Sequence, residues 1–144
     1  MSKPIEFDPA FVTGVEEIDM QHRNLIHLTN EAGRVLVGNP PPRVMRAMVQ
    51  ELLSYAIYHF RTEEALMREY GYIEAGDDNA DEHIRRHRDF SVRVVEMQKA
   101  LQSHEPVNCA ELNAFLTDWV AKHIMGTDQQ LAAFILEKRT AQRD

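Results

Sequence analysis

An imidazole and a carboxylate stand four residues apart near the middle of the 144-residue chain, within residues 59–64 (HFRTEE). Four residues are close to one helical turn, so His59 and Glu63 would lie one above the other on a helix. The same face carries Leu52, Ala56 and Leu66 at helical spacing, which directs both polar groups towards the interior. A buried carboxylate is costly without a counter-charge, and a metal ion is one partner that compensates this cost.

Histidines lie on the apolar stripes of three further segments. At about 100° per residue in a helix, His22 is in phase with Ile18 and Ile26, and His123 is in phase with Leu116. A lone core histidine is more often structural, and histidine pairs four residues apart are common on surfaces. Five inward-facing histidines are hard to satisfy by protein hydrogen bonds alone, which favours a metal site. The candidate ligands by phase are His22, His59, Glu63, His83, His87 and His123.

Asp128 joins this set only if the last helix is interrupted. In an unbroken helix it would lie about 140° from His123 and face away from it. Gly126, between the two, would let the chain end one helix and direct Asp128 back to the site. The alternative, in which Thr127 or Asp128 merely caps a final helix, stays open on periodicity alone.

The elements that must position these residues are long helices with short connections. Gly38 and Asn39 followed by three prolines give a firm stop, and Asn108 with Glu111 is typical of a capping box. No strand pattern, internal repeat or low-complexity tract is present. We therefore expect an all-α protein, an antiparallel up-down four-helix bundle, as one domain over residues 1–144. The expected parts are an extended arm at 1–17, a bundle over 18–125 and a short C-terminal helix at 128–139. Within the bundle, the helices are expected at about 19–37, from just after the prolines to about 70, from the end of a connection at about 79 to about 103, and from about 109 to 125.

Composition narrows the class of protein. A content of 44% hydrophobic and 27% charged residues is ordinary for a globular chain. The net charge of −7, without a basic stripe, argues against nucleic acid and membrane as partners. The single cysteine, Cys109, excludes an intramolecular disulfide, and no apolar run is typical of a signal peptide or a membrane span. We expect a cytoplasmic protein that is a monomer.

Several stretches together resemble the hemerythrins, in particular the single-domain bacteriohemerythrins. They are residues 14–22 (GVEEIDMQH), residues 59–67 (HFRTEEALM), the HxxxH of His83 and His87 followed by Phe90, and residues 119–123 (WVAKH) leading to Asp128. The resemblance covers residues 7–136. The spacing from Glu63 to His83 is longer than is usual in the family, and the extra residues fall in the acidic connection around 76–81, where an insertion costs little.

The resemblance implies a cofactor of two iron ions with an oxo or hydroxo bridge. By position, Glu63 and Asp128 would bridge the irons, His83, His87 and His123 would hold one, and His22 and His59 the other. The first iron would then be fully coordinated, and the second would keep one position open, where members of this family bind dioxygen. The resemblance thus implies reversible oxygen binding for carriage, storage or delivery. By phase, the side chains expected to form an apolar ligand pocket, with plain core packing as the competing interpretation, are Ile26, Phe90, Leu116, Trp119 and Val120.

Other functions stay open at this point. The same domain could sense oxygen or redox state through a separate partner, handle peroxide or nitric oxide as an enzyme, or be a metal-free bundle. No spare acid or base lies on the same stripes, which favours a binding protein over an enzyme. We expect His27, His104 and Glu64 to be solvated surface residues and Cys109 to be a buried apolar filler.

Overall fold

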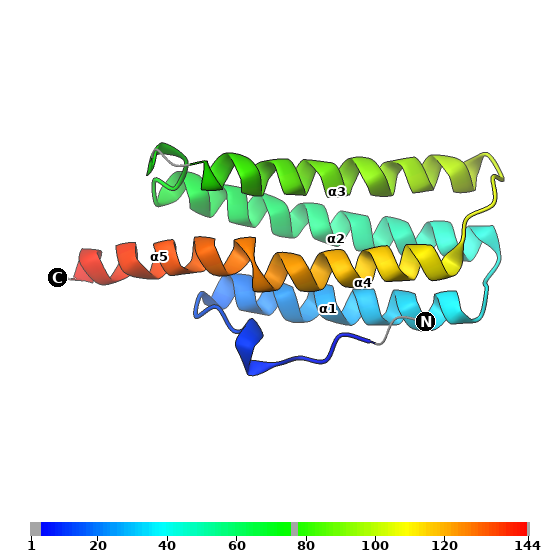
Figure 1. The fold of residues 1–144 in the computed structure, drawn as a ribbon, viewed down its shortest axis with the longest axis horizontal. Coiled ribbons are helices and arrows are strands. Elements are labelled where there is room, and N and C mark those ends of the chain that lie inside the picture. Colours follow the sequence, from blue (N-terminus) through cyan, green and yellow to red (C-terminus); the bar gives the residue numbers. More distant parts are fainter. Residues whose placement is uncertain (1–3, 76–77, 144) are drawn as a thin grey trace.

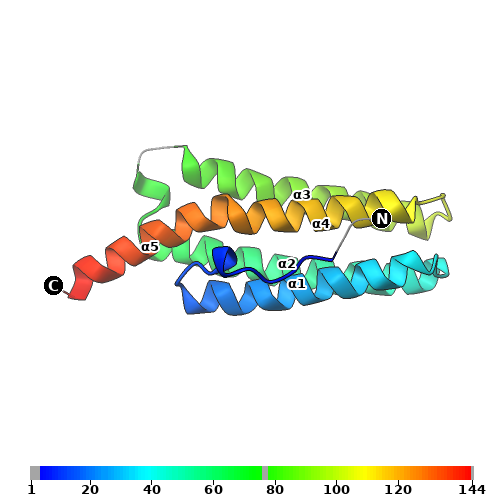
Figure 2. The ribbon, with the colours of Figure 1, turned by 60° about the horizontal axis from the view of Figure 1, so that its bottom comes forward.

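The computed structural model describes residues 4–75 and 78–143, and over these residues the chain is helical and contains no strand (Figure 1). Four helices alternate in direction and form the expected antiparallel bundle. A further helix continues the direction of the fourth and projects beyond the bundle (Figures 1 and 2). The helices are α1 (Glu16–Val37), α2 (Pro42–Glu69), α3 (Asn79–Gln102), α4 (Cys109–Met125) and α5 (Thr127–Arg143), with short 3-10 turns η1 (Pro9–Phe11) and η2 (Ile73–Ala75).

Local sequence signals account for the start of α4 and the end of α2. At α4, the side chain of Asn108 accepts a hydrogen bond of 3.0 Å from the backbone N–H of Glu111, which is one of the two hydrogen bonds of the predicted capping box. At the end of α2, Gly71 adopts a φ of +75°, which lets the N–H of Tyr72 reach the carbonyl oxygen of Met67 at 2.8 Å. This arrangement is a Schellman motif, and it directs the chain towards α3.

The N-terminal arm is fixed to α1 by one buried carboxylate. Asp19 accepts hydrogen bonds from the backbone N–H and the hydroxyl of Thr13, both at 2.8 Å, and from the N–H of Gly14 at 3.1 Å. α1 begins at Glu16, earlier than the predicted start near Asp19, so that Asp19 lies within the first turns of the helix while it binds the arm. The predicted arm therefore ends before residue 16, and its residues 1–3 lie outside the described part.

Two further expectations need comment. The C-terminal helix was expected to be short, ending near residue 139, but α5 has 17 residues, as many as α4. Residues 76 and 77 of the acidic connection lie outside the described residues. α3 begins at Asn79, at the end of the predicted connection, which the longer spacing had left without an exact boundary. Within the described residues, no helix is both long and apolar enough to cross a membrane.

The apolar core is divided into two clusters along the bundle. The main cluster fills most of its length and includes Leu25, Leu53, Phe90, Val94, Leu116 and Val120. The end cluster lies where α5 begins and includes Val15, Ile18, Leu66, Met67, Leu131 and Ile135. On α1 and α3, the histidines singled out by the sequence fall between residues of the two clusters. On α2 only Glu63 does so, whereas His59 and, on α4, His123 lie among residues of the main cluster.

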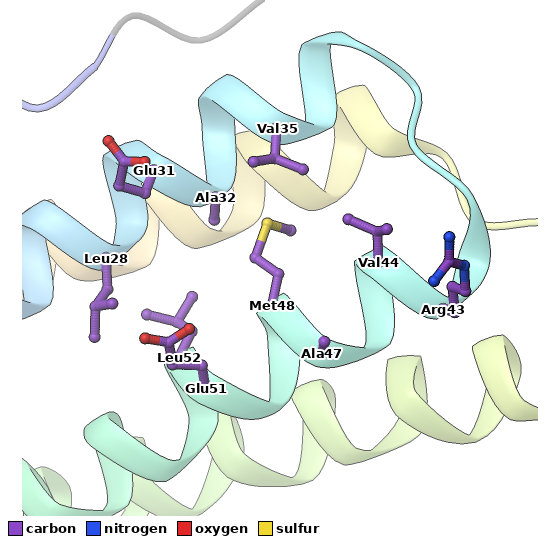
Figure 3. A pocket seen from close by; sticks show the side chains of 10 residues that line it. All are labelled: Leu28, Glu31, Ala32, Val35, Arg43, Val44, Ala47, Met48, Glu51 and Leu52. Carbon is purple, nitrogen blue, oxygen red and sulfur yellow. The ribbon is translucent and has the colours of Figure 1, made fainter.

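A groove of about 470 Å³ lies between α1 and α2, towards the connection that joins them (Figure 3). Its walls are apolar and include Leu28, Val35, Val44 and Met48, and the side chains of Glu31, Arg43 and Glu51 stand at its edge. None of the histidines discussed above lines it.

Candidate metal centre

The structure brings all seven predicted ligand side chains together between the main and end clusters. Each is at most 3% exposed, although every one is polar or charged. They come from all five helices, so no single element builds the site. The set consists of His22 from α1, His59 and Glu63 from α2, His83 and His87 from α3, His123 from α4 and Asp128 from α5.

All five histidines present the same ring nitrogen, Nε2, to the two carboxylates. Around Asp128, the distance from Nε2 to the nearer carboxylate oxygen is 2.5 Å for His22, 2.9 Å for His83 and 2.8 Å for His123. Around Glu63, the corresponding distance is 3.0 Å for His59, 3.2 Å for His87 and 3.1 Å for His123. A shared centre approached by one nitrogen of each ring is the geometry of metal ligation.

The donor atoms form two overlapping groups, within each of which all atoms lie within 4.8 Å of one another. Both groups contain Glu63 and Asp128. The larger group adds three histidines and the smaller group adds two. The groups are Glu63, His83, His87, His123 and Asp128, and His22, His59, Glu63 and Asp128.

Hydrogen bonds do not satisfy this cluster. Among the described residues, Nε2 of His83 and of His87, Oε2 of Glu63 and Oδ1 of Asp128 are buried and lack a hydrogen-bond partner. These atoms lie close to opposite charges, but not with hydrogen-bond geometry. Orphaned buried donors and acceptors of this kind are rare in native proteins, and lone pairs directed at one shared centre fit a bound metal ion. Imidazole and carboxylate ligands suit iron, and also zinc and manganese.

The break between α4 and α5 decides the position of Asp128. α4 ends at Met125 and α5 starts at Thr127, with Gly126 as the intervening residue. Asp128 is fully buried against the histidines, so the interpretation in which it only caps α5 is wrong. The Thr127 hydroxyl lies 3.1 Å from Nδ1 of His123, so this turn also contacts a predicted ligand from behind.

The carboxylates change the protonation of the surrounding imidazoles. Burial alone would lower the pKa of His59, but the nearby charges of Glu63 and Asp128 outweigh it and raise that pKa to about 10. The same opposition raises the pKa of His83 to about 9 and also raises the pKa of His123. Without metal, protons on these imidazoles therefore supply the positive charge that the carboxylates require.

The remaining shifts follow from the same charges. Burial alone would raise the pKa of Glu63, but His59 and His123 hold it well below its ordinary value. The pKa of Asp128 is likewise held well below its ordinary value, against burial and the charge of Glu63, mainly by His123. The pKa of His87 is lowered, chiefly by burial. Both acids are thus ionised at neutral pH, as metal ligation requires.

Aromatic rings stack against two of the imidazoles. The ring of Phe60 lies 4.0 Å from that of His87 and nearly parallel to it, at 12°. Trp119 stacks on His123 at 4.5 Å and 17°, and it also contacts Phe90 at 4.4 Å. Phase analysis did not identify Phe60 as part of the site, because its partner is on a different helix.

The predicted pocket residues belong to the main cluster. Trp119 is half-buried and packs against the cluster from its edge, and the other four are buried within it. Their role around a bound ligand stays a prediction. The buried four are Ile26, Phe90, Leu116 and Val120.

Two expectations about peripheral residues are wrong. Glu64 is not simply solvated: its carboxylate accepts a hydrogen bond from Nδ1 of His87 at 3.0 Å, with the side chain 28% exposed. Cys109 is half-buried instead of buried, and its sulfur lies 3.6 Å from that of Met45. His27 and His104 are exposed, as predicted.

Comparisons with known proteins give a consistent result. The family model described as "Hemerythrin HHE cation binding domain" matches residues 13–135. A bacteriohemerythrin of Stenotrophomonas maltophilia (strain R551-3) is 33% identical over 119 residues, which cover 83% of this chain and 73% of the relative. A bacteriohemerythrin of Pseudomonas aeruginosa (strain LESB58) is 30% identical over 81% of this chain and 71% of its own. A hemerythrin-like protein of Naegleria gruberi is 28% identical over 88% of this chain and 90% of its own.

Proposed function

The chain belongs to the hemerythrin family, and from this premise we propose that it binds dioxygen reversibly at two non-haem irons held by the seven buried side chains. When bound, the iron pair supplies the electrons and the open coordination position that dioxygen requires. The protein supplies the ligands, their orientation and a surrounding that limits access of water. This function covers oxygen carriage, storage or delivery.

The observation that carries the proposal is the unequal size of the two ligand groups. Glu63 and Asp128 are common to both, so the difference lies in the histidines: three on one side, His22 and His59 on the other. A metal ion held by His22 and His59 together with the two shared carboxylates would have one protein ligand fewer, and therefore one position more for an external ligand. An open position distinguishes a reactive metal site from a structural one.

The surroundings favour binding over turnover. The site is enclosed by the main and end clusters, which exclude water and keep the local dielectric low. Two further acids at its edges are engaged by other groups: Asp19 by Thr13 and Gly14, and Glu64 by His87. Among the described residues, the titratable groups inside the site are the proposed ligands themselves. A general acid or base free to drive repeated turnover would have to come from elsewhere.

The test is a cycle of reduction and oxygenation. Purified iron-loaded protein is reduced without oxygen, exposed to air and then returned to an inert atmosphere. We expect two irons per chain and a visible charge-transfer absorption that appears in air and disappears again when oxygen is removed. A chain that oxidises irreversibly in the first exposure, or that consumes peroxide steadily, would contradict the proposal and favour an enzyme.

A matched pair of variants on α1 distinguishes the loss of a metal ligand from a general effect on the helix. His22→Ala removes one of only two histidines of the smaller group, and should abolish the oxygen-dependent absorption. His27→Ala changes an exposed histidine of the same helix and should leave the absorption and the iron content unchanged. Equal loss in both variants would show that the effect is on folding.

A further inference from the structure

The five imidazoles differ in what holds their outer nitrogen, Nδ1. Nδ1 of His87 is hydrogen-bonded to the carboxylate of Glu64 at 3.0 Å. Nδ1 of His59 is hydrogen-bonded to the neutral amide oxygen of Gln21 at 2.8 Å. His123 has the Thr127 hydroxyl, and among the described residues Nδ1 of His22 and of His83 has no hydrogen-bond partner. The one carboxylate among these partners therefore serves the larger ligand group.

The orientation of the Gln21 amide is fixed by a chain of hydrogen bonds. The hydroxyl of Thr62 donates to the carbonyl oxygen of Tyr58 at 3.2 Å, which can only accept. Thr62 therefore accepts from the Nε2 group of Gln21 at 3.0 Å, so that the amide oxygen of Gln21 faces His59. Nδ1 of His59 must then be the donor of the pair. The chain keeps a proton on Nδ1 and leaves the lone pair of Nε2 directed at the site.

We propose that Gln21 is a positioning residue that fixes the tautomer of His59 through a neutral acceptor, and that this neutrality keeps the reduction potential of the smaller ligand group's metal high. The carboxylate of Glu64, through His87, lowers the reduction potential of the metal held by the larger ligand group. The proposal rests on the proposed iron site, but not on oxygen binding. Its consequence is that the metal with the open position is the easier one to keep reduced, which a reversible oxygen carrier needs.

The physical reason is the charge of the acceptor. A carboxylate draws the imidazole proton more strongly than an amide oxygen, because the hydrogen bond is charge-assisted. The imidazole then becomes a stronger electron donor and stabilises the more oxidised, more highly charged metal. Gln21 is 7% exposed, so a charge at this position would be weakly screened. An amide at Gln21 avoids that effect while it keeps the ring in place.

The decisive variant is Gln21→Glu, because glutamate has nearly the shape of glutamine and can still accept from Nδ1 of His59. We expect a shift of the reduction potential of the iron-loaded protein to more negative values and a several-fold faster oxidation in air. The matched control is Gln50→Glu, which adds the same charge at an exposed position of α2 and should shift neither quantity. An unchanged potential in Gln21→Glu with full iron content would overturn the proposal.

The reciprocal variant, Glu64→Gln, replaces the carboxylate at His87 by an amide and should shift the potential to more positive values. It also carries the test alone if Gln21→Glu fails to bind iron: a positive shift supports the proposal, and an unchanged potential overturns it. Because the readout is a potential, the result does not depend on oxygen binding. A protein that fails the oxygenation cycle can still pass this test, and the reverse also holds.

A second readout addresses the tautomer directly. In zinc-loaded protein, which is diamagnetic, Nδ1–H of His59 should give a downfield proton signal that exchanges slowly. Gln21→Ala should remove this signal and weaken metal binding by about 10–100-fold. Persistence of the signal in Gln21→Ala would show that another group holds the ring and would overturn the positioning role.

Discussion

At the scale of single residues, the site is a balance of buried charges. Glu63 and Asp128 are ionised and fully buried, a state that costs several kcal/mol for each ion unless opposite charge lies close by. The imidazoles around them supply this charge as protons when metal is absent and supply lone pairs when it is present. The same side chains can therefore stabilise the fold in both states.

Glu63 is the residue on which this balance depends most, since it belongs to both ligand groups and contacts His59, His87 and His123. We expect Glu63→Ala to lose most bound iron. In metal-free protein the same change should lower the free energy of unfolding by about 3–5 kcal/mol, because it leaves imidazolium charge without its partner. Iron per chain and chemical denaturation measure the two effects.

The control for this prediction is Glu51→Ala, which removes an exposed carboxylate from the same helix. Both its iron content and its stability should match those of the unmodified protein, since exposed charges contribute little. A Glu63→Ala protein that still carries two irons would contradict the shared-ligand role.

At the scale of elements, the interruption between α4 and α5 directs Asp128 into the site. The N–H of Gly126 donates to the carbonyl oxygen of Lys122 at 2.9 Å, which closes α4. A side chain at this position would have its Cβ 3.0 Å from the same oxygen. The turn is thus compact, and its shape is matched to glycine.

Gly126→Ala tests this element without touching any polar side chain. The added methyl group should force a small displacement of the turn and cost about 1–3 kcal/mol of stability, as overpacking does. The displacement should also reduce iron content, because Asp128 follows two residues later. Thermal unfolding and iron analysis of the same preparation report both effects.

Gly38→Ala provides the comparison, since a Cβ there would lie 3.5 Å from the carbonyl oxygen of Val35, an ordinary contact. It should leave iron content unchanged. If Gly126→Ala also retained full iron and stability, the turn would tolerate a side chain and would not be what positions Asp128.

Periodicity predicted the helices and their inward faces because phase within one helix depends only on that helix. It did not predict contacts between helices: Gln21 with His59, Glu64 with His87, or Phe60 stacked on His87. Glu64 was assigned to solvent from its angle on α2 alone, but α3 packs alongside and brings His87 to it. One sequence signal was not used: both polar residues are chain neighbours of predicted ligands. Gln21 precedes His22, and Glu64 follows Glu63.

At the scale of the whole molecule, the two apolar clusters hold the site between them. On α1 and α3, the residues on either side of it belong to different clusters, such as Ile18 and Leu25 around His22. The site is therefore coupled to the packing of both parts of the bundle. The protonation of a few buried groups should then be visible in the stability of the entire fold.

The sign of the pH dependence in metal-free protein follows from the pKa shifts. The raised pKa values of His59 (about 10) and His83 (about 9) give stability that is complete below their unfolded value near 6.5 and is lost as pH rises through the folded values. The lowered pKa values of Glu63 and Asp128 give stability that is present at neutral pH and is lost only as pH falls in the acid range. Metal-free protein should therefore become less stable from about pH 6.5 upwards.

Bound metal should reverse the dependence of stability on pH. A metal ion binds the deprotonated imidazoles, so loading displaces the protons of His59 and His83 and becomes more favourable as pH rises. We expect the Tm of chelated protein to fall between pH 6.5 and 9, with a loss of at most about 1.4 kcal/mol per pH unit for each histidine, while the Tm of metal-loaded protein rises or stays level. His27→Ala, whose ring is exposed, should change neither slope. Parallel slopes with and without metal would mean that the buried imidazoles do not exchange protons for metal, and the seven side chains would then not be one metal centre.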